Sequence, residues 1–213
     1  MVIEKIKESI SETWDNMSQS IILNTKSYSS EKSLVFNFAW NYYRCNLKTI
    51  EAVDFECSLF DGYSNGTFLD LLIIQEIGNS KVKIGIEFKF MNRKSNNTGQ
   101  TQVRTKIIND LKKLSWLVNK KRIDIGCFLC LTNEHEYINV GRKTVLSEFA
   151  THHNKFYKQG TFFPTDIKLN ENVKVTNDIN FKWQNIQMTK QDRYVIDNYK
   201  YAVLEPIFIF NYL

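Results

Sequence analysis

The segment that most restricts the fold is residues 82–90, Val-Lys-Ile-Gly-Ile-Glu-Phe-Lys-Phe, where apolar residues alternate strictly with polar or small ones. Successive side chains of a β-strand point to opposite faces, so this period of two is typical of a strand with one buried face. The even-numbered positions form the apolar face. The other face carries Lys83, Gly85, Glu87 and Lys89. The sequence therefore predicts a sheet protein in which Glu87 and Lys89 are neighbours on one side of a strand.

Periodic patterns on both sides of this strand predict the other elements. Helices are expected at residues 2–17, after a cap cluster at residues 27–30, and along a stripe formed by Val103, Ile107, Leu111, Leu114 and Val118. Strands are expected at residues 50–60, 67–77 and 123–132, with turns at 61–66 and 78–80. The order from the second helix onward is helix, three strands, helix, strand (αβββαβ). This order predicts an α/β (α+β) fold with a central mixed sheet flanked by helices.

The size of the chain indicates one domain, residues 1–213. With 213 residues, of which 43% are hydrophobic, it is long enough for one domain with a well-buried core but too short for two such domains. The last third has weaker patterns: a helix is expected at 145–157, a strand at 180–188 and a final aromatic strand at 201–212. We infer no function from residues 133–213.

The sequence gives little indication of a secretory leader or a membrane helix. The first eight residues carry charges where a secretory leader needs an apolar run, and the richest apolar stretches fall short of the roughly 20 residues of a membrane helix. We therefore expect a cytoplasmic protein without a membrane partner.

Cys127 and Cys130 have a C-x-x-C spacing, but they lie in a predicted strand where residues three apart face opposite ways. Buried reduced thiols are expected rather than a zinc site.

The positive charge of the chain is concentrated in one segment. Residues 81–122 contain twelve Lys and Arg against two acids, a net charge of +10, so the remainder of this +5 chain carries −5. Such a segregation suggests a polyanion as partner. The alternative is an ordinary solvated helix face, which is at least as good an interpretation for Lys112, Lys113, Lys120 and Lys121.

Asp70 interrupts an otherwise apolar strand at residues 68–74. Burying even a neutral polar group without a partner costs on the order of 2–7 kcal/mol, so a cation should compensate this carboxylate. A hairpin around residues 78–80 would place Asp70 and Glu87 at similar distances from the turn, on adjacent strands. Two converging carboxylates suit Mg²⁺ or Mn²⁺, and Lys89 beside them suits water orientation or transition-state stabilisation.

The arrangement of Asp70, sixteen intervening residues and then Glu87-Phe88-Lys89, in this order of elements, resembles the PD-(D/E)xK nuclease superfamily over about residues 30–132. The resemblance implies a restriction-endonuclease-like catalytic core at 30–132, a C-terminal elaboration at 133–213, and Mg²⁺-dependent hydrolysis of DNA in restriction, phage defence or repair. It also implies that Asp70, Glu87 and the Phe88 carbonyl bind the metal, that Lys89 acts on the attacking water, and that Glu31 adds an acidic ligand. Leu69 occupies the position of the name-giving Pro.

The loop and helix after Lys89 carry candidates for contact with a nucleic acid. Four cations there can neutralise phosphates, which adds affinity and salt dependence but no sequence information: Arg93, Lys94, Arg104 and Lys106. The resemblance adds Gln100, with Gln102 as a second-tier candidate, because some members use a Gln near the metal or substrate. We expect double-stranded DNA as the partner. A homodimer is expected as well, since cutting both strands needs two sites.

Structural interpretations compete with each of these roles. Glu87 and Lys89 suit a solvated strand face with weak ion pairs, and Asp70 suits a strand-end carboxylate bonded to turn amides. Glu31 suits a first-turn acid favoured by the helix dipole. Glu56 is a second-tier candidate that its spacing does not decide. At the level of function, the alternatives are an inactive or effector-gated nucleic-acid-binding module of this fold, and a small protein whose basic helix binds an acidic partner.

Overall fold

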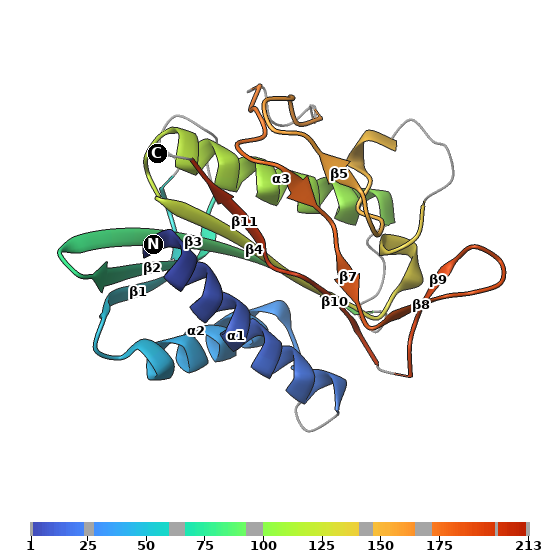
Figure 1. Ribbon diagram of the computed structural model, residues 1–213, viewed down its shortest axis with the longest axis horizontal. Helices are drawn as coiled ribbons and strands as arrows, with labels where there is room; N and C mark the ends of the chain where they lie inside the picture. The colour runs from blue at the N-terminus through green and yellow to red at the C-terminus, as the bar shows by residue number, and fades with distance from the viewer. Residues whose placement is uncertain are drawn as a thin grey trace.

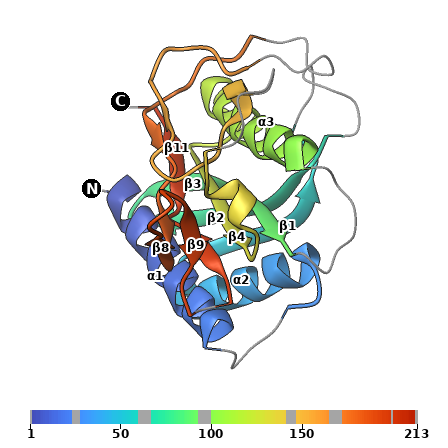
Figure 2. The same ribbon diagram turned by 90° about the vertical axis from the view of Figure 1, so that its right-hand side faces the viewer.

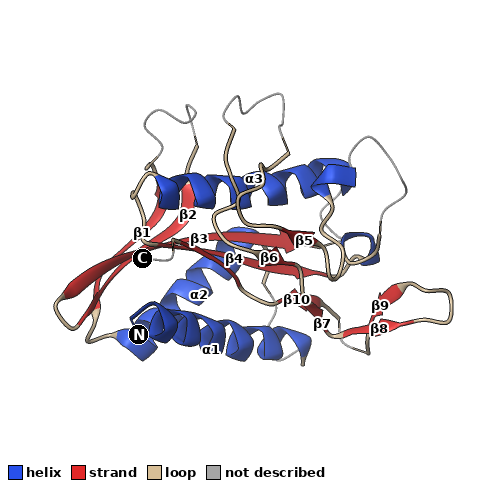
Figure 3. Ribbon diagram, turned by 45° about the horizontal axis from the view of Figure 1, so that its top comes forward, coloured by secondary structure: helices blue, strands red, loops and turns tan. Residues whose placement is uncertain are grey.

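The computed structural model describes residues 2–23, 28–59, 67–92, 100–140, 147–164, 172–198 and 200–211. Its α-helices are α1 (Val2–Ile22), α2 (Glu31–Asn46) and α3 (Gln100–Asn119), and they cover a large mixed β-sheet (Figure 1). Helix α3 lies on one face of the sheet, whereas α1 and α2 lie on the other (Figure 3). The predicted α/β class is therefore confirmed. Among the described residues, no helix is both long and apolar enough to cross a membrane.

Among the described residues, the main sheet has seven strands. Six follow the order β1-β2-β3-β4-β10-β7. The seventh, β11, pairs with the first half of β4, whereas β10 pairs with its end. The strands are β1 (Ile50–Cys57), β2 (Leu69–Ile77), β3 (Ser80–Met91), β4 (Ile125–Thr132), β7 (Trp183–Gln184), β10 (Ala202–Leu204) and β11 (Ile207–Phe210). Pairing is antiparallel from β1 to β3 and parallel between β3 and β4, because α3 makes the crossover. The predicted succession of helix, three strands, helix and strand is observed from α2 to β4.

The alternation on β3 divides the protein into two cores. The even-numbered residues of β3 pack against α1 and α2, in one buried apolar cluster. The second cluster lies between the sheet and α3 and includes much of the chain after residue 137. Cys127 belongs to the first cluster and Cys130 to the second, and both thiols are free and buried. The prediction that these cysteines face opposite ways is confirmed.

Helix α2 begins where the sequence predicted a cap. The Ser30 side-chain oxygen accepts the Ser33 N–H at 3.2 Å, which satisfies one of the free donors of the first helical turn. At the far end, the Tyr42 hydroxyl donates to Gln75 Oε1 of β2 at 2.7 Å. The cap and this buried bond hold the helix in register along the sheet, so Glu31 stands at a defined position.

The C-terminal expectations were partly wrong. Instead of a helix over 145–157, the described residues show the short 3-10 turn η2 (Ser147–Phe149) and the strand β5 (Phe156–Tyr157), which pairs with β6 (Ile179–Asn180); residues 141–146 lie outside the described residues. The strand expected at 180–188 is divided among β6, β7 and β8 (Ile186–Met188), and β8 pairs with β9 (Tyr194–Ile196).

The final aromatic strand is also divided. Strands β10 and β11 both pair with β4, and Glu205-Pro206 lies between them. Proline has no backbone N–H to donate to a ladder, which explains the interruption. The C-terminal region thereby extends the same sheet that the predicted core begins.

Candidate active site

Asp70 lies where β2 and β3 separate. The ladder between these strands pairs Leu71 with Ile86, and Asp70 is the next residue toward the start of β2. Its Oδ2 accepts the backbone N–H of Phe88 at 2.8 Å, in the place of a strand partner. A carboxylate has two oxygens, so this bond orients Asp70 without using its whole capacity as a ligand.

Glu31 also accepts a backbone N–H of β3, from helix α2 on the sheet face opposite α3. It is the first residue of α2, and its Oε2 accepts the Phe90 N–H at 2.9 Å. Its Oε1 lies 3.5 Å from Lys89 Nζ. Two carboxylates from different elements thus bind alternate N–H groups of β3, and the first-turn position of Glu31 gives it a specific partner rather than the helix dipole alone.

Glu87 and Lys89 point from β3 toward α3. Glu87 is only 1% exposed, and its Oε1 lies 2.8 Å from Lys113 Nζ. Lys89 Nζ lies 2.9 Å from Asp110 Oδ2 and donates to the Phe88 carbonyl at 2.9 Å. The interpretation of this strand face as solvated is therefore wrong, because its charges are buried beneath a helix.

Helix α3 contributes the two residues that sequence reasoning missed, Asp110 and Lys113. They are three apart and so share one face of the helix, and Lys113 Nζ lies 2.9 Å from Asp110 Oδ1. Lys113 therefore bridges Asp110 and Glu87. One signal was available in the sequence: Asp110 is the one acidic residue of α3, set within its apolar stripe.

The expectation that Lys112 and Lys113 belong to a solvated helix face was wrong. Lys112 is fully buried and the Lys113 side chain is 14% exposed, whereas Lys120 and Lys121 are exposed. The reason is that α3 contacts the sheet, including β11, and also the C-terminal segments η1 (His135–Tyr137) and η2. A helix covered from several directions buries its flanks as well as its stripe.

The charges of this ion cluster do not balance. With every group ionised, its members comprise four carboxylates and two ammonium groups, a formal charge of −2: Glu31, Asp70, Glu87, Asp110, Lys89 and Lys113. Buried charge of one sign is costly without compensation. A divalent cation would neutralise the excess.

Three of the carboxyl groups have raised pKa values, and burial is the main cause in each. Burial raises the pKa of Glu31 and of Asp70, although Lys89 and one backbone N–H oppose the effect in each case. Burial also raises the pKa of Glu87 well above its ordinary value, and the nearby Asp110 carboxylate raises it further. These groups would ionise more readily with another cation beside them.

Asp110 and the two lysines form the balanced part of the cluster. Burial disfavours the Asp110 carboxylate, but Lys89 and Lys113 outweigh it and hold the pKa of Asp110 below its ordinary value. For both lysines burial acts to lower the pKa, yet the surrounding carboxylates raise it overall. Lys89 and Lys113 therefore remain charged at neutral pH.

The donor chemistry of the cluster fits a hard divalent ion. Carboxylate oxygens and the Phe88 carbonyl are the ligand types that Mg²⁺ and Mn²⁺ prefer. Glu87 Oε1 lies 2.8 Å from Lys113 Nζ, so an ammonium group already stands beside this carboxylate. Within the described ranges, no three acidic, His or Cys side chains gather around one point as ligands, and the two ammonium groups lie between the carboxylates.

Glu56 and Arg104 are engaged elsewhere. Glu56 forms an exposed ion pair with Lys32 at 2.7 Å, and it does not join the ion cluster. The Arg104 guanidinium donates to the backbone carbonyls of Glu136 and Asn139, so it ties α3 to the segment around η1. Its side chain serves the packing of the fold in this structure.

The other predicted contacts fall partly on the surface. Gln102 and Lys106 are exposed on the first turns of α3. Gln100 begins α3, but its side chain is not described, and Arg93 and Lys94 lie outside the described residues. Exposure leaves Gln102 and Lys106 open to a partner.

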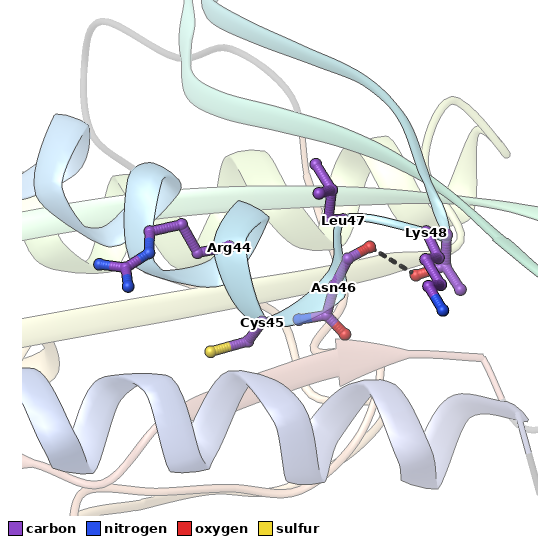
Figure 4. A pocket seen from close by; sticks show the side chains of 6 residues that line it. Arg44, Cys45, Asn46, Leu47 and Lys48 are labelled. Atoms are coloured by element: carbon purple, nitrogen blue, oxygen red, sulfur yellow. Dashed lines mark hydrogen bonds between the residues drawn. The ribbon is translucent and has the colours of Figure 1, made fainter.

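A pocket of about 400 Å³ lies apart from the ion cluster. It is lined by residues 44–49, at the C-terminal end of α2 and the turn into β1 (Figure 4). Glu31 is at the opposite end of this 16-residue helix, which spans about 24 Å at 1.5 Å per residue. The pocket therefore does not include the residues that carry chemistry.

The family resemblance draws no support from known proteins. No protein-family model, curated protein or solved structure matches the chain. A function for this chain is therefore inferred from the residues and geometry of the ion cluster.

Proposed function

We propose that this protein is a Mg²⁺-dependent endonuclease that hydrolyses phosphodiester bonds of DNA through a PD-(D/E)xK-type site, with residues 30–132 as a restriction-endonuclease-like core. The observation that carries the proposal is the buried Glu87 on the same strand face as Lys89, in an ion cluster with excess negative charge. In proteins generally, replacing a buried ion pair by apolar residues of similar volume is often neutral or stabilising, so a gain in stability is a weak explanation for this cluster.

The proposal assigns the metal to Asp70, Glu87 and the Phe88 carbonyl, with Glu31 as a further acidic group. Mg²⁺ is the expected ion and Mn²⁺ a substitute. When bound, such an ion supplies an activated water and neutralises charge that develops on the phosphate. The bond from the Phe88 N–H to Asp70 orients that carboxylate in advance, which reduces the reorganisation that binding requires.

Lys89 acts as a cation in this proposal. Its ammonium group is held by Asp110 and by the Phe88 carbonyl, and its pKa is raised, so it stays protonated at neutral pH. A protonated amine cannot accept a proton from water. We therefore assign Lys89 to orienting the nucleophile and stabilising the charged transition state, rather than to general base catalysis.

The DNA partner is inferred from charge. Lys106 and Gln102 are exposed on α3, the helix that also contributes to the cluster. Gln100 at the start of α3, and Arg93 and Lys94 before it in the sequence, keep their predicted roles. Phosphate contacts of this kind position a duplex without specifying a base sequence. Restriction, phage defence and repair, in the cytoplasm, are the processes that such an enzyme would serve.

A second copy of the chain is the proposed partner for cutting both strands. Helix α2 exposes Phe36 and Trp40, and Leu47 directly after the helix is exposed as well. Phe36 stacks on Phe55 of β1, with the ring centroids 6.4 Å apart. Arg44 and Lys48, at the end of α2 and in the turn after it, are exposed, as are Glu51 and Asp54 of β1. A two-fold axis can pair such opposite charges between copies. Particle mass in solution tests this, because Trp40→Glu should convert a dimer to a monomer.

Two alternatives remain distinct in experiment. An inactive module of the same fold would bind nucleic acid without cutting it, and a basic interaction protein would bind an acidic partner without a metal. The intact set of Asp70, Glu87 and Lys89 favours the enzyme. An Asp70→Ala variant that loses metal binding but keeps its partner would favour the interaction protein.

The deciding experiment is cleavage of plasmid DNA and of single-stranded RNA at low salt, with Mg²⁺, Mn²⁺ or EDTA. Wild type is compared with Glu87→Gln and with the matched surface control Glu56→Gln. The proposal expects metal-dependent cutting of DNA by wild type and the control but not by Glu87→Gln. Equal, metal-independent cutting by all three would indicate a contaminant, and RNA cutting alone would reassign the substrate.

A further inference from the structure

Lys113 occupies an unusual position for a surface-helix lysine. Its Nζ lies 2.8 Å from Glu87 Oε1 and 2.9 Å from Asp110 Oδ1, and 3.4 Å from the Phe68 carbonyl oxygen. All three neighbours are oxygens, and two are carboxylates. A compact cation surrounded by oxygen atoms is the arrangement that a divalent metal would also adopt.

Glu87 depends on this ammonium group. Among the described residues, Glu87 is the most deeply buried carboxylate, at 1% exposed, and Lys113 is the cation whose attraction opposes the effects of burial and of Asp110. Without a positive charge nearby, the carboxylate would carry the full cost of desolvation. Lys113 thus does for Glu87 what a metal ion would do.

The geometry points to Lys113 as an internal cation that competes with the divalent metal for Glu87 and is displaced when the metal binds. This inference rests on the proposed function, because it concerns the metal site assigned there. Displacement would not leave the ammonium group without partners, since Asp110 Oδ1 and the Phe68 carbonyl lie on its other sides. The four-carbon stem of lysine is flexible enough for a shift between neighbouring oxygens.

Competition has a direct thermodynamic consequence. Two cations that exclude each other from one carboxylate are negatively coupled, and typical couplings between sites change affinity roughly 5–150-fold. Removing the charge of Lys113 should therefore tighten metal binding by a factor in that range. The opposite result is expected if Lys113 merely supports the fold of the site.

The test is Mn²⁺ binding by the full chain, measured by calorimetry without nucleic acid. Wild type is compared with Lys113→Met, which keeps the length of the side chain but not its charge, and with Lys113→Arg, which keeps the charge. Lys120→Met removes an exposed charge from the end of the same helix and controls for the overall field. Lys113→Gln serves as a second neutral variant where thermal unfolding shows that Lys113→Met is not folded.

We expect the neutral variants to bind Mn²⁺ about 5-fold more tightly or better, with Lys113→Arg and Lys120→Met near wild type. Equal affinity in wild type and Lys113→Met would overturn the inference and leave the proposed metal site intact, as would weaker binding by the variant. Absence of Mn²⁺ binding in every chain would reject the metal site itself. The two failures are therefore distinguishable.

Discussion

The two faces of β3 contrast sharply. Toward α1 and α2, Ile84, Ile86 and Phe88 are fully buried in an apolar cluster, and the Phe88 ring meets Phe38 of α2 edge-on at 5.4 Å. Toward α3, the same strand places Glu87 and Lys89 among other buried charges. Figure 2 shows α2 and α3 on opposite sides of the sheet that contains this strand. One strand therefore contributes both to a stabilising apolar core and to a cluster of buried charged groups.

The contrast shows what each face is for. Apolar burial stabilises a fold by about 25 cal/mol per Å² removed from water, whereas buried charges lose several kcal/mol each in hydration that ion pairs only partly restore. The apolar face is therefore expected to supply stability. The charged face is expected to cost stability and to supply chemistry.

The largest effect is expected for Glu87→Gln. Loss of a carboxylate that holds the metal should lower DNA cleavage by about 10³-fold. Stability without metal should stay equal or rise, because a neutral amide replaces a buried carboxyl group with a strongly raised pKa. Cleavage rates and thermal unfolding in EDTA measure the two effects. Loss of activity that accompanies a large loss of stability would instead indicate a structural role for Glu87.

Ile86, next to Glu87 but on the opposite face of β3, should affect stability rather than cleavage. Ile86→Ala removes a fully buried side chain and leaves a cavity, which should lower the free energy of unfolding by about 2–5 kcal/mol. The cleavage rate per folded molecule should remain close to wild type at a temperature where the variant is folded. Urea unfolding measures the first quantity. A specific loss of cleavage without destabilisation would show that the two faces are not separable.

A third prediction concerns pH in the absence of metal. Glu31, Asp70 and Glu87 all have raised pKa values in the folded protein, so the folded state binds protons more readily than the unfolded state. Their contribution to stability is present below the ordinary carboxyl pKa and is lost as the pH rises through the raised values. Wild type in EDTA should therefore be less stable at pH 8 than at pH 5.

Two comparisons sharpen this pH prediction. Glu87→Gln should show a smaller fall in stability over the same pH range, because it lacks the carboxyl group whose pKa is raised well above the ordinary value. Added Mg²⁺ should restore stability at pH 8 in wild type, since a ligand that binds only the folded state stabilises it. A stability that rises from pH 5 to pH 8 in EDTA would contradict the charge excess of the cluster.

Local patterns explain which parts of this structure were predictable. The strict alternation on β3 and the stripes of α2 and α3 reflect contacts within one element, so the sequence predicted them. Asp70 was recognisable because it interrupts an apolar strand. Strands β7, β10 and β11 have two to four residues each, which is too short for a period to appear, and their place depends on pairing with β4 and with each other.

Asp110 and Lys113 were missed for a related reason. On a helix, charged residues beside an apolar stripe are normally solvated, and the single acidic residue of α3, Asp110, was the one local signal against this expectation. Segments more than 20 residues away cover the flank of α3, and β3 supplies the partner charge, Glu87. Such an ion cluster is determined by tertiary contacts, and the sequence alone indicated four of its six members.

The smallest effect is expected at Lys106, on the exposed side of α3 rather than in the cluster. Lys106→Ala should weaken duplex DNA binding to a similar degree for all sequences and reduce the slope of log affinity against log salt by about 1, as expected for one lost phosphate contact. Fluorescence anisotropy in EDTA, in a Glu87→Gln background, measures binding without cleavage. The matched control is Lys190→Ala, an exposed lysine in the turn between β8 and β9. Equal slopes for both variants would remove α3 from the proposed DNA interface, while the assignment of the buried cluster would still depend on Glu87.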